Sequence, residues 1–207
     1  MLLGTAAFRR RAAAPLRSVA YLDLAGINAA SVAMSVGAYA PGRALFALAF
    51  QSNTLASLTI DGITPSLLAS GNAGGMNVYL WATSASTASG DVTVVRAGSP
   101  ANSQVILFGA YGYADDAVND FEVAGVATNN QTASSISLDV PANGAVLAGG
   151  RQYEAFSVGP ATAYEVDNFS VGAAVANLAA NPSYGITATV DVNRTLKVLA
   201  GASLIPV

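Results

Sequence analysis

Apolar and polar residues alternate in short stretches along most of this chain. Residues 31–36 and 135–140 alternate strictly, so every second side chain lies on one face of an extended strand. Residues 43–50 form an apolar run, and residues 105–111 are apolar on both faces, which is typical of a buried central strand. Both patterns predict β-structure. The side chains expected to face inward from the alternating stretches are Val32, Met34, Val36, Ile136, Leu138 and Val140.

Turn-forming pairs of residues separate these stretches. A Pro-Gly pair lies at 41–42, an Asp-Gly pair at 61–62 and an Asn-Gly pair at 143–144. The Asp-Gly pair predicts a hairpin of two short strands within residues 58–69, because both residues can adopt the unusual backbone angles of a tight turn. Other strands are expected at residues 19–24, 76–83, 89–95 and 145–148.

The C-terminal part of the chain predicts further pairs of strands. Residues 153–158 are expected to pair with residues 164–171, and residues 184–192 to form a closing hairpin with residues 195–200. Residues 173–180 are expected to form a short turn of helix or a loop. Altogether the pattern amounts to about twelve short strands at intervals of about ten residues, which suits an antiparallel β-sandwich or a jelly roll.

A basic segment precedes the first predicted strand. It contains Arg9, Arg10, Arg11 and Arg17, and no acidic residue accompanies them. We interpret it as an extended arm, residues 1–17, that docks on an acidic neighbouring subunit. A targeting presequence or secretory signal and a disordered tail without a role are the alternatives.

The densest acidic cluster lies within residues 114–125, which are expected to form a loop. Asp115, Asp116 and Asp120 are the residues expected to receive the basic arm of another subunit, because the two largest charge clusters have opposite sign. Carboxylates also bind calcium, but their spacing here differs from that of an EF-hand loop. A solvated acidic loop is the remaining alternative.

The rest of the chain, residues 18–207, is expected to be one all-β domain, an antiparallel β-sandwich with jelly-roll character. No linker rich in proline or glycine and no internal repeat stands out in it. Only 10% of residues are charged, whereas ordinary soluble domains have about 25%. We therefore expect much of the surface to be buried in an assembly, a homo-oligomer included; a secreted β-protein with few charges is the alternative.

Several classes of function are excluded by composition. The chain has no histidine and no cysteine, so it contains neither a Ser-His-Asp triad nor a thiolate metal site. Its single lysine, Lys197, is not part of a phosphate-binding loop motif. The net charge of −3 argues against a nucleic-acid surface, and no apolar stretch is long enough for a membrane span. The expectation is a protein that is not an enzyme and has no cofactor or metal.

The order of strands and turns resembles a β-sandwich module of structural proteins from alphaproteobacterial tailed phages, prophages and gene-transfer-agent-like particles. The segments that carry the resemblance are residues 41–50, 58–70, 76–81, 89–94 and 135–148. It covers roughly residues 36–150, and the basic arm is not part of it. The resemblance implies a structural role in a virion, with no catalytic residues.

The function expected on these grounds is that of a capsid decoration or cement protein bound to the major capsid protein. A tail or fibre component that binds a receptor or a glycan is the alternative, and a secreted carbohydrate-binding or adhesive module is a third. Trp81 and Tyr79 share one face of a predicted strand and could stack on a sugar. We favour a place in the core for these aromatic residues, because large aromatic side chains are usually buried in a sandwich.

Overall fold

The computed structural model describes residues 17–26, 31–54, 57–85, 87–97, 103–126, 132–153, 155–158, 164–166, 170–189 and 197–207. These residues form sixteen β-strands and no helix. The strands are β1 (Ser18–Gly26), β2 (Ser31–Gly37), β3 (Arg43–Gln51), β4 (Ser57–Ile60), β5 (Ser66–Ala73), β6 (Met76–Thr83), β7 (Gly90–Ala97), β8 (Gln104–Tyr111), β9 (Tyr113–Val126), β10 (Ala133–Val140), β11 (Gly144–Arg151), β12 (Ala155–Val158), β13 (Tyr164–Val166), β14 (Ser170–Leu178), β15 (Asn181–Thr189) and β16 (Lys197–Pro206).

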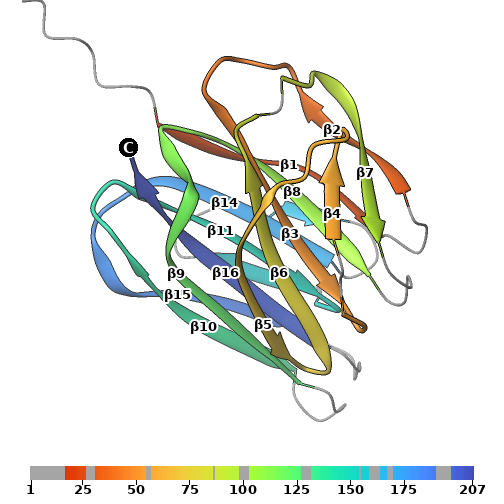
Figure 1. The fold of residues 1–207 in the computed structure, drawn as a ribbon. Helices are drawn as coiled ribbons and strands as arrows, with labels where there is room; N and C mark the ends of the chain where they lie inside the picture. The colour runs from red at the N-terminus through yellow and green to blue at the C-terminus, as the bar shows by residue number, and fades with distance from the viewer. Residues whose placement is uncertain are drawn as a thin grey trace, which may run out of the picture.

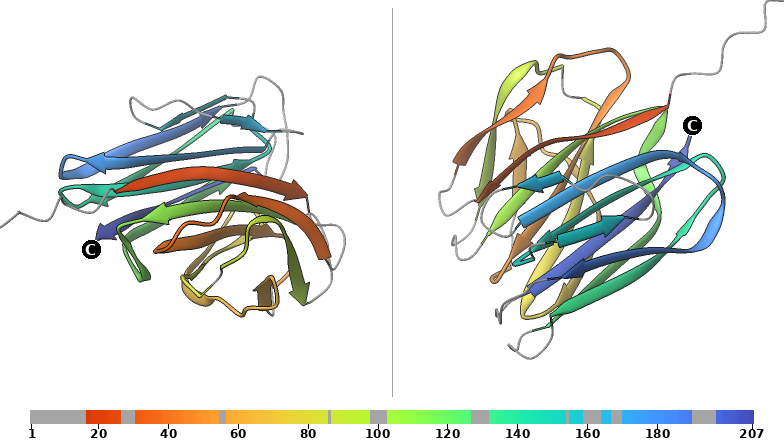
Figure 2. Two further views of the ribbon diagram at one scale, coloured as in Figure 1. Left: turned by 90° about the horizontal axis from the view of Figure 1, so that it is seen from above. Right: turned by 180° about the vertical axis from the view of Figure 1, so that it is seen from behind.

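The strands form four antiparallel sheets that lie in layers. Two five-stranded sheets are in the middle: inner sheet 1 has the order β1-β8-β3-β6-β5, and inner sheet 2 has the order β9-β16-β11-β14-β13. Outer sheet 1, β2-β7-β4, covers the far face of inner sheet 1, and outer sheet 2, β10-β15-β12, covers the far face of inner sheet 2. The layers are visible when the molecule is seen from above (Figure 2). The antiparallel β-sandwich predicted from the sequence is confirmed.

The two halves of the chain have the same topology (Figure 1). Adding eight to every strand number turns inner sheet 1 into inner sheet 2 and outer sheet 1 into outer sheet 2, with every neighbour preserved. In each half, a 1-8-3-6 sheet faces a 2-7-4 sheet, which is the strand order of a jelly roll. The chain therefore carries two jelly-roll-like sandwiches in tandem, a repeat that its sequence does not reveal.

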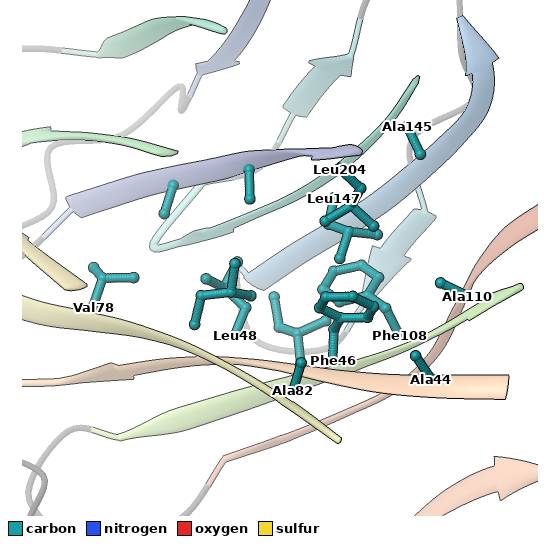
Figure 3. Close-up of a cluster of buried hydrophobic side chains, with 14 of the residues drawn as sticks. Ala44, Phe46, Leu48, Val78, Ala82, Phe108, Ala110, Ala145, Leu147 and Leu204 are labelled. Carbon is teal, nitrogen blue, oxygen red and sulfur yellow. The ribbon is translucent and has the colours of Figure 1, made fainter. Parts of the chain in front are cut away.

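The two halves share one hydrophobic core. Side chains of β3, β6 and β8 point from inner sheet 1 towards those of β11 and β16 from inner sheet 2. In Figure 3, Phe46 and Phe108 lie side by side and face Leu147 and Leu204 of the second half. Two further cores lie under the outer sheets, one in each half. The halves are thus joined by a packed interior and not by a linker alone.

This layering explains the apolar runs in the sequence. Every residue of β3 is buried, because each of its faces meets another sheet. Leu45 and Ala47 pack in the core under outer sheet 1, while Phe46 and Leu48 pack in the core between the halves. By contrast, β2 and β10 belong to the outer sheets and have one face in solvent, so their sequences alternate. The inward side chains predicted for both strands are confirmed.

Several predicted strand pairs are wrong. Residues 155–158 form β12, which pairs with β15, whereas residues 164–166 form β13, which pairs with β14. The closing hairpin is also wrong, because β15 lies in outer sheet 2 and β16 in inner sheet 2. The turn proposed for this hairpin lies outside the described residues. The short helix or loop expected at residues 173–180 is mostly strand β14.

The Asp-Gly turn forms, but it does not make the predicted hairpin. Asp61 and Gly62 have φ angles of 52° and 76°, and Ile60 and Ile63 exchange backbone hydrogen bonds of 2.9 and 3.0 Å around them. Beyond this bridge the strands separate: β4 pairs with β7 in outer sheet 1, and β5 pairs with β6 in inner sheet 1. The turn therefore carries the chain from one layer of the sandwich to the other.

Candidate functional site

The sequence-predicted contact residues divide into three groups. Arg9, Arg10 and Arg11 lie outside the described residues. Arg17 is the first described residue and lies just before β1. The acidic residues were predicted to lie in a loop. They lie instead on the long strand β9, at the edge of inner sheet 2. That prediction was wrong because Asp120 and Glu122 alternate with Phe121 and Val123, which pack against the shared core.

Arg17 is bound to its own chain, at the junction of the two halves. Its Nη2 donates to the carbonyl oxygen of Val207 (3.1 Å), and its own carbonyl accepts from Nδ2 of Asn177 (3.0 Å). The backbone N–H of Val207 in turn donates to the carbonyl of Gly112, which separates β8 from β9 (3.1 Å). Arg17 thus holds the start of the described chain beside its last residue and beside the connection between the halves.

Asp120 is also used within the chain. Its Oδ1 accepts from the N–H of Phe121 (2.8 Å) and its Oδ2 from the N–H of Asp139 on β10 (2.8 Å). On the same strand, Oε2 of Glu122 accepts from the N–H of Ser137 (2.7 Å). Because β10 is an edge strand of outer sheet 2, these carboxylates occupy backbone donors that would otherwise be open to another strand. Glu122 belongs to the acidic cluster recognised in the sequence but was not among the predicted contact residues.

The first half contains the same device. Oδ2 of Asp23 on β1 accepts from the N–H of Ser35 on β2 (2.6 Å), and its Oδ1 accepts from the N–H of Leu24 (2.7 Å). Strand β2 is an edge strand of outer sheet 1, as β10 is of outer sheet 2. A carboxylate on the first strand of each half therefore covers the edge formed by the second strand. Negative charge at a sheet edge also discourages pairing with other chains.

We expect the double variant Asp120→Ala/Glu122→Ala to lose about 1–2 kcal/mol of unfolding free energy, because three charge-assisted hydrogen bonds at the sandwich surface are removed, two of them to β10. The open edge of β10 should also increase self-association. Urea unfolding and sedimentation velocity measure the two effects. Asp91→Ala is the matched control, since Asp91 is an exposed acid on β7, in the other half of the chain. Equal behaviour of the two proteins would show that the carboxylates do not protect this edge.

Asp115 and Asp116 remain available to a partner. Asp116 is exposed and Asp115 is half-buried, and neither side chain makes a hydrogen bond or ion pair within the described part of the chain. They follow Gly112 by three and four residues in the sequence. A Cβ atom at Gly112 would lie within 4 Å of Arg17, so this part of the chain lies next to Arg17. The acidic end of β9 therefore lies close to the point from which the basic segment leaves. No group of three acidic residues that could hold a metal ion occurs among the residues described.

The outer faces of the two outer sheets are built mostly from small side chains, with Val95 of β7 as a larger exposed apolar residue. On outer sheet 1, Ser31 and Ala33 of β2 and Thr93 of β7 are exposed. On outer sheet 2, exposed Ser135 lies beside Thr187, with their hydroxyl oxygens 3.1 Å apart. The charged residues exposed on these strands, as far as they are described, are Asp91 and Asp139. These faces lie on opposite sides of the layered molecule.

The two aromatic residues considered for sugar stacking, Trp81 and Tyr79, belong to a core, as favoured from the sequence. Trp81 is 8% exposed and packs with Tyr79 in the core under outer sheet 1. Tyr153 is fully buried, and its hydroxyl donates to Oγ of Ser134 at 2.5 Å. Burial raises the pKa of the Tyr153 hydroxyl above its usual value. Neither Trp81 nor Tyr153 offers a ring face to a sugar.

Comparison with known proteins identified no relative. No family model matches the chain, and no curated protein and no solved structure matches it. Among the described residues, no helix is long and apolar enough to cross a membrane.

Proposed function

We propose that this chain is a non-enzymatic structural component of a tailed-phage virion, where it decorates the capsid as a cement protein. The observation that carries the proposal is the pair of outer sheets, which present two nearly uncharged faces of mostly small residues on opposite sides of two halves that share one core. Such faces suit close contact with neighbouring subunits. A decoration protein stabilises a shell because it binds only the assembled form.

The tandem jelly-roll architecture supports the same role. Jelly rolls are common in viral capsid proteins and in lectins. The shared core makes the two halves one unit, so contacts at one outer face and at the other reinforce each other. The low content of charged residues, 10%, fits a surface that is largely covered in the assembled particle.

The basic segment is proposed to supply the contact between subunits. Arg9, Arg10 and Arg11 of one copy would bind Asp115 and Asp116 of a neighbouring copy, whose carboxylates have no partner within the described chain. Opposite charges at an interface mainly raise the rate of association and fix its orientation. Asp120 and Arg17 are left out of this contact, because both are bound within their own chain.

Co-sedimentation of the full chain with undecorated capsids tests the proposal. We expect the wild-type protein to sediment with the capsids, and the variant with Arg9, Arg10 and Arg11 changed to Glu to bind at least about tenfold more weakly. The matched control changes the same residues to Lys, which keeps their charge, and should bind almost normally. If no form binds capsids, the chain is not a decoration protein.

A negative result would direct attention to the tail. The alternative assignment, a tail or fibre component that binds a receptor or a glycan, predicts affinity for purified tails or for host-surface sugars. The buried positions of Trp81 and Tyr153 do not favour sugar binding. Tyr39, which is 38% exposed, is the described aromatic residue to replace if a glycan array gives a signal.

A further inference from the structure

Arg96 occupies a core position in outer sheet 1. Val92 and Val94 precede it on the inward face of β7, and it continues their row. Its side chain is only 3% exposed. Gln51, at the end of β3, lies beside it and is 1% exposed. A charged side chain therefore lies at the end of the first half, where the alternation of β7 would place an apolar residue.

The guanidinium of Arg96 uses only part of its hydrogen-bonding capacity. Its Nη1 donates to Oε1 of Gln51 at 2.6 Å. Its Nε and Nη2, and Nε2 of Gln51, are buried without a hydrogen-bond partner in the part of the chain that the structure describes. The Nε–H and Nη2–H bonds of an arginine run parallel along one edge of the group. This edge is the one that binds two oxygens of a carboxylate or phosphate.

Arg43 shows how the same sandwich supplies acceptors to the terminal nitrogens of a buried arginine elsewhere, although its Nε also has no hydrogen-bond partner among the described residues. Arg43, also 3% exposed, donates to the carbonyl oxygens of Val36 (2.6 Å), Ala38 (3.0 Å) and Ala88 (2.6 Å). Backbone acceptors therefore use both of its terminal nitrogens. Arg96 has one neutral side-chain acceptor instead, and its paired Nε and Nη2 donors are left over.

No acidic residue is close in sequence to neutralise Arg96. The segments that continue from β3 and β7, residues 52–57 and 97–103, contain no Asp or Glu. Burial of a positive charge without an anion is costly, since an arginine does not lose its proton near neutral pH. Burial lowers the pKa of the Arg96 guanidinium, in accordance with this cost. An anion with two adjacent oxygens would offset the cost of burying this positive charge.

We propose that Arg96 and Gln51 form a binding site for a small oxyanion, such as inorganic phosphate, at the end of the first jelly-roll sandwich. Nε and Nη2 of Arg96 bind two oxygens of the anion, and Nε2 of Gln51 is the further donor at the site. Because the donors are buried, the ligand is a small free ion and not a side chain of another protein. Its binding ties the end of β3 to the end of β7. This site does not depend on the proposed virion function.

Thermal unfolding at constant ionic strength, with chloride exchanged for phosphate, tests the site. We expect a saturable rise of the midpoint, about 3–6 °C at a phosphate concentration about ten times Kd. The ³¹P resonance of phosphate should broaden in the presence of the wild-type protein. No saturable shift and no broadening would overturn the proposal.

Substitutions separate a specific site from a general salt effect. Arg96→Met places an apolar side chain of similar length in an apolar row, and should abolish the effect of phosphate. Arg96→Lys keeps the charge but not the parallel donors, and should weaken phosphate binding by about tenfold. This variant tests the site if Arg96→Met does not fold. Arg151→Met, which removes a partly buried arginine from the second half, is the matched control. A phosphate effect that is the same in all four proteins would exclude this site.

Discussion

Replacement of Phe46 by alanine is expected to destabilise the whole chain by about 3–5 kcal/mol. Phe46 is fully buried in the core between the inner sheets, beside Phe108 and opposite Leu147 (Figure 3). Removal of the ring leaves a cavity bordered by both halves. The two halves should therefore lose stability together, in one unfolding transition. Urea unfolding followed by far-ultraviolet circular dichroism measures the loss.

A second substitution decides whether the halves unfold as one unit. Trp81 is the only tryptophan and lies in the first half, so its fluorescence reports on that half. Leu138→Ala creates a cavity in the second half alone, under outer sheet 2. If the shared core couples the halves, this change shifts the Trp81 transition as much as the circular dichroism transition. A Trp81 transition that stays at its wild-type position would contradict the coupling.

The positions of most strands were predictable because burial on one face or two leaves a local pattern. β10 alternates because one face meets the core and the other meets solvent, and β8 is apolar from Val105 onwards because it lies between two layers. Partners were not predictable in this way. Residues 184–189 and 197–200 have the patterns of strands and are close in sequence, yet β15 and β16 belong to different sheets. Pairing depends on contacts that are distant along the chain.

The tandem repeat was invisible because equivalent positions share a role and not an identity. Phe46 and Leu147 both fill the shared core, from equivalent places in β3 and β11. Asp23 and Glu122 both bind a backbone N–H of the next strand, with side chains of different length. A jelly roll requires each side chain to have a suitable size and to lie on the inward or outward face of its strand. Many different sequences meet these requirements.

The candidate site was predicted only in part. The acidic cluster was recognised from its charge, but its strand was overlooked, although Asp120-Phe121-Glu122-Val123 alternates polar and apolar residues. That alternation is the signal that could have corrected the expectation of a loop. The buried position of Arg96 also had a signal, since this residue is in phase with Val92 and Val94. Its leftover hydrogen-bond donors could not be inferred without the structure.

A second large loss of stability is expected at one of two glycines that occupy equivalent positions in the two halves. Gly26 follows Asp23-Leu24-Ala25 near the end of the first strand of one half, and Gly125 follows Glu122-Val123-Ala124 in the other. Gly26 pairs with Gln104 at the start of β8, and Gly125 pairs with Val198 near the start of β16. Neither glycine has a positive φ, so alanine is compatible with the backbone at both. Only the space around them differs.

Gly125→Ala is expected to cost about 2–3 kcal/mol of stability, whereas Gly26→Ala should change it by less than about 0.5 kcal/mol. A Cβ atom at Gly26 would meet nothing within 4 Å. At Gly125 it would meet the carbonyl oxygen of Lys197 and, at 3.1 and 3.2 Å, the backbone N of Gly74 and C of Ala73. These are backbone atoms on both sides, so no side-chain rotation makes room.

The difference follows from the way the inner sheets close against each other. Gly125 lies where β9, an edge of inner sheet 2, passes the end of β5, an edge of inner sheet 1. An alanine there forces the two edges apart and opens the shared core. Urea unfolding of the two variants, measured side by side with the wild-type protein, tests this. Equal stability of the two variants would mean that β5 and β9 do not approach closely, and that the two sandwiches are joined less tightly than their shared core implies.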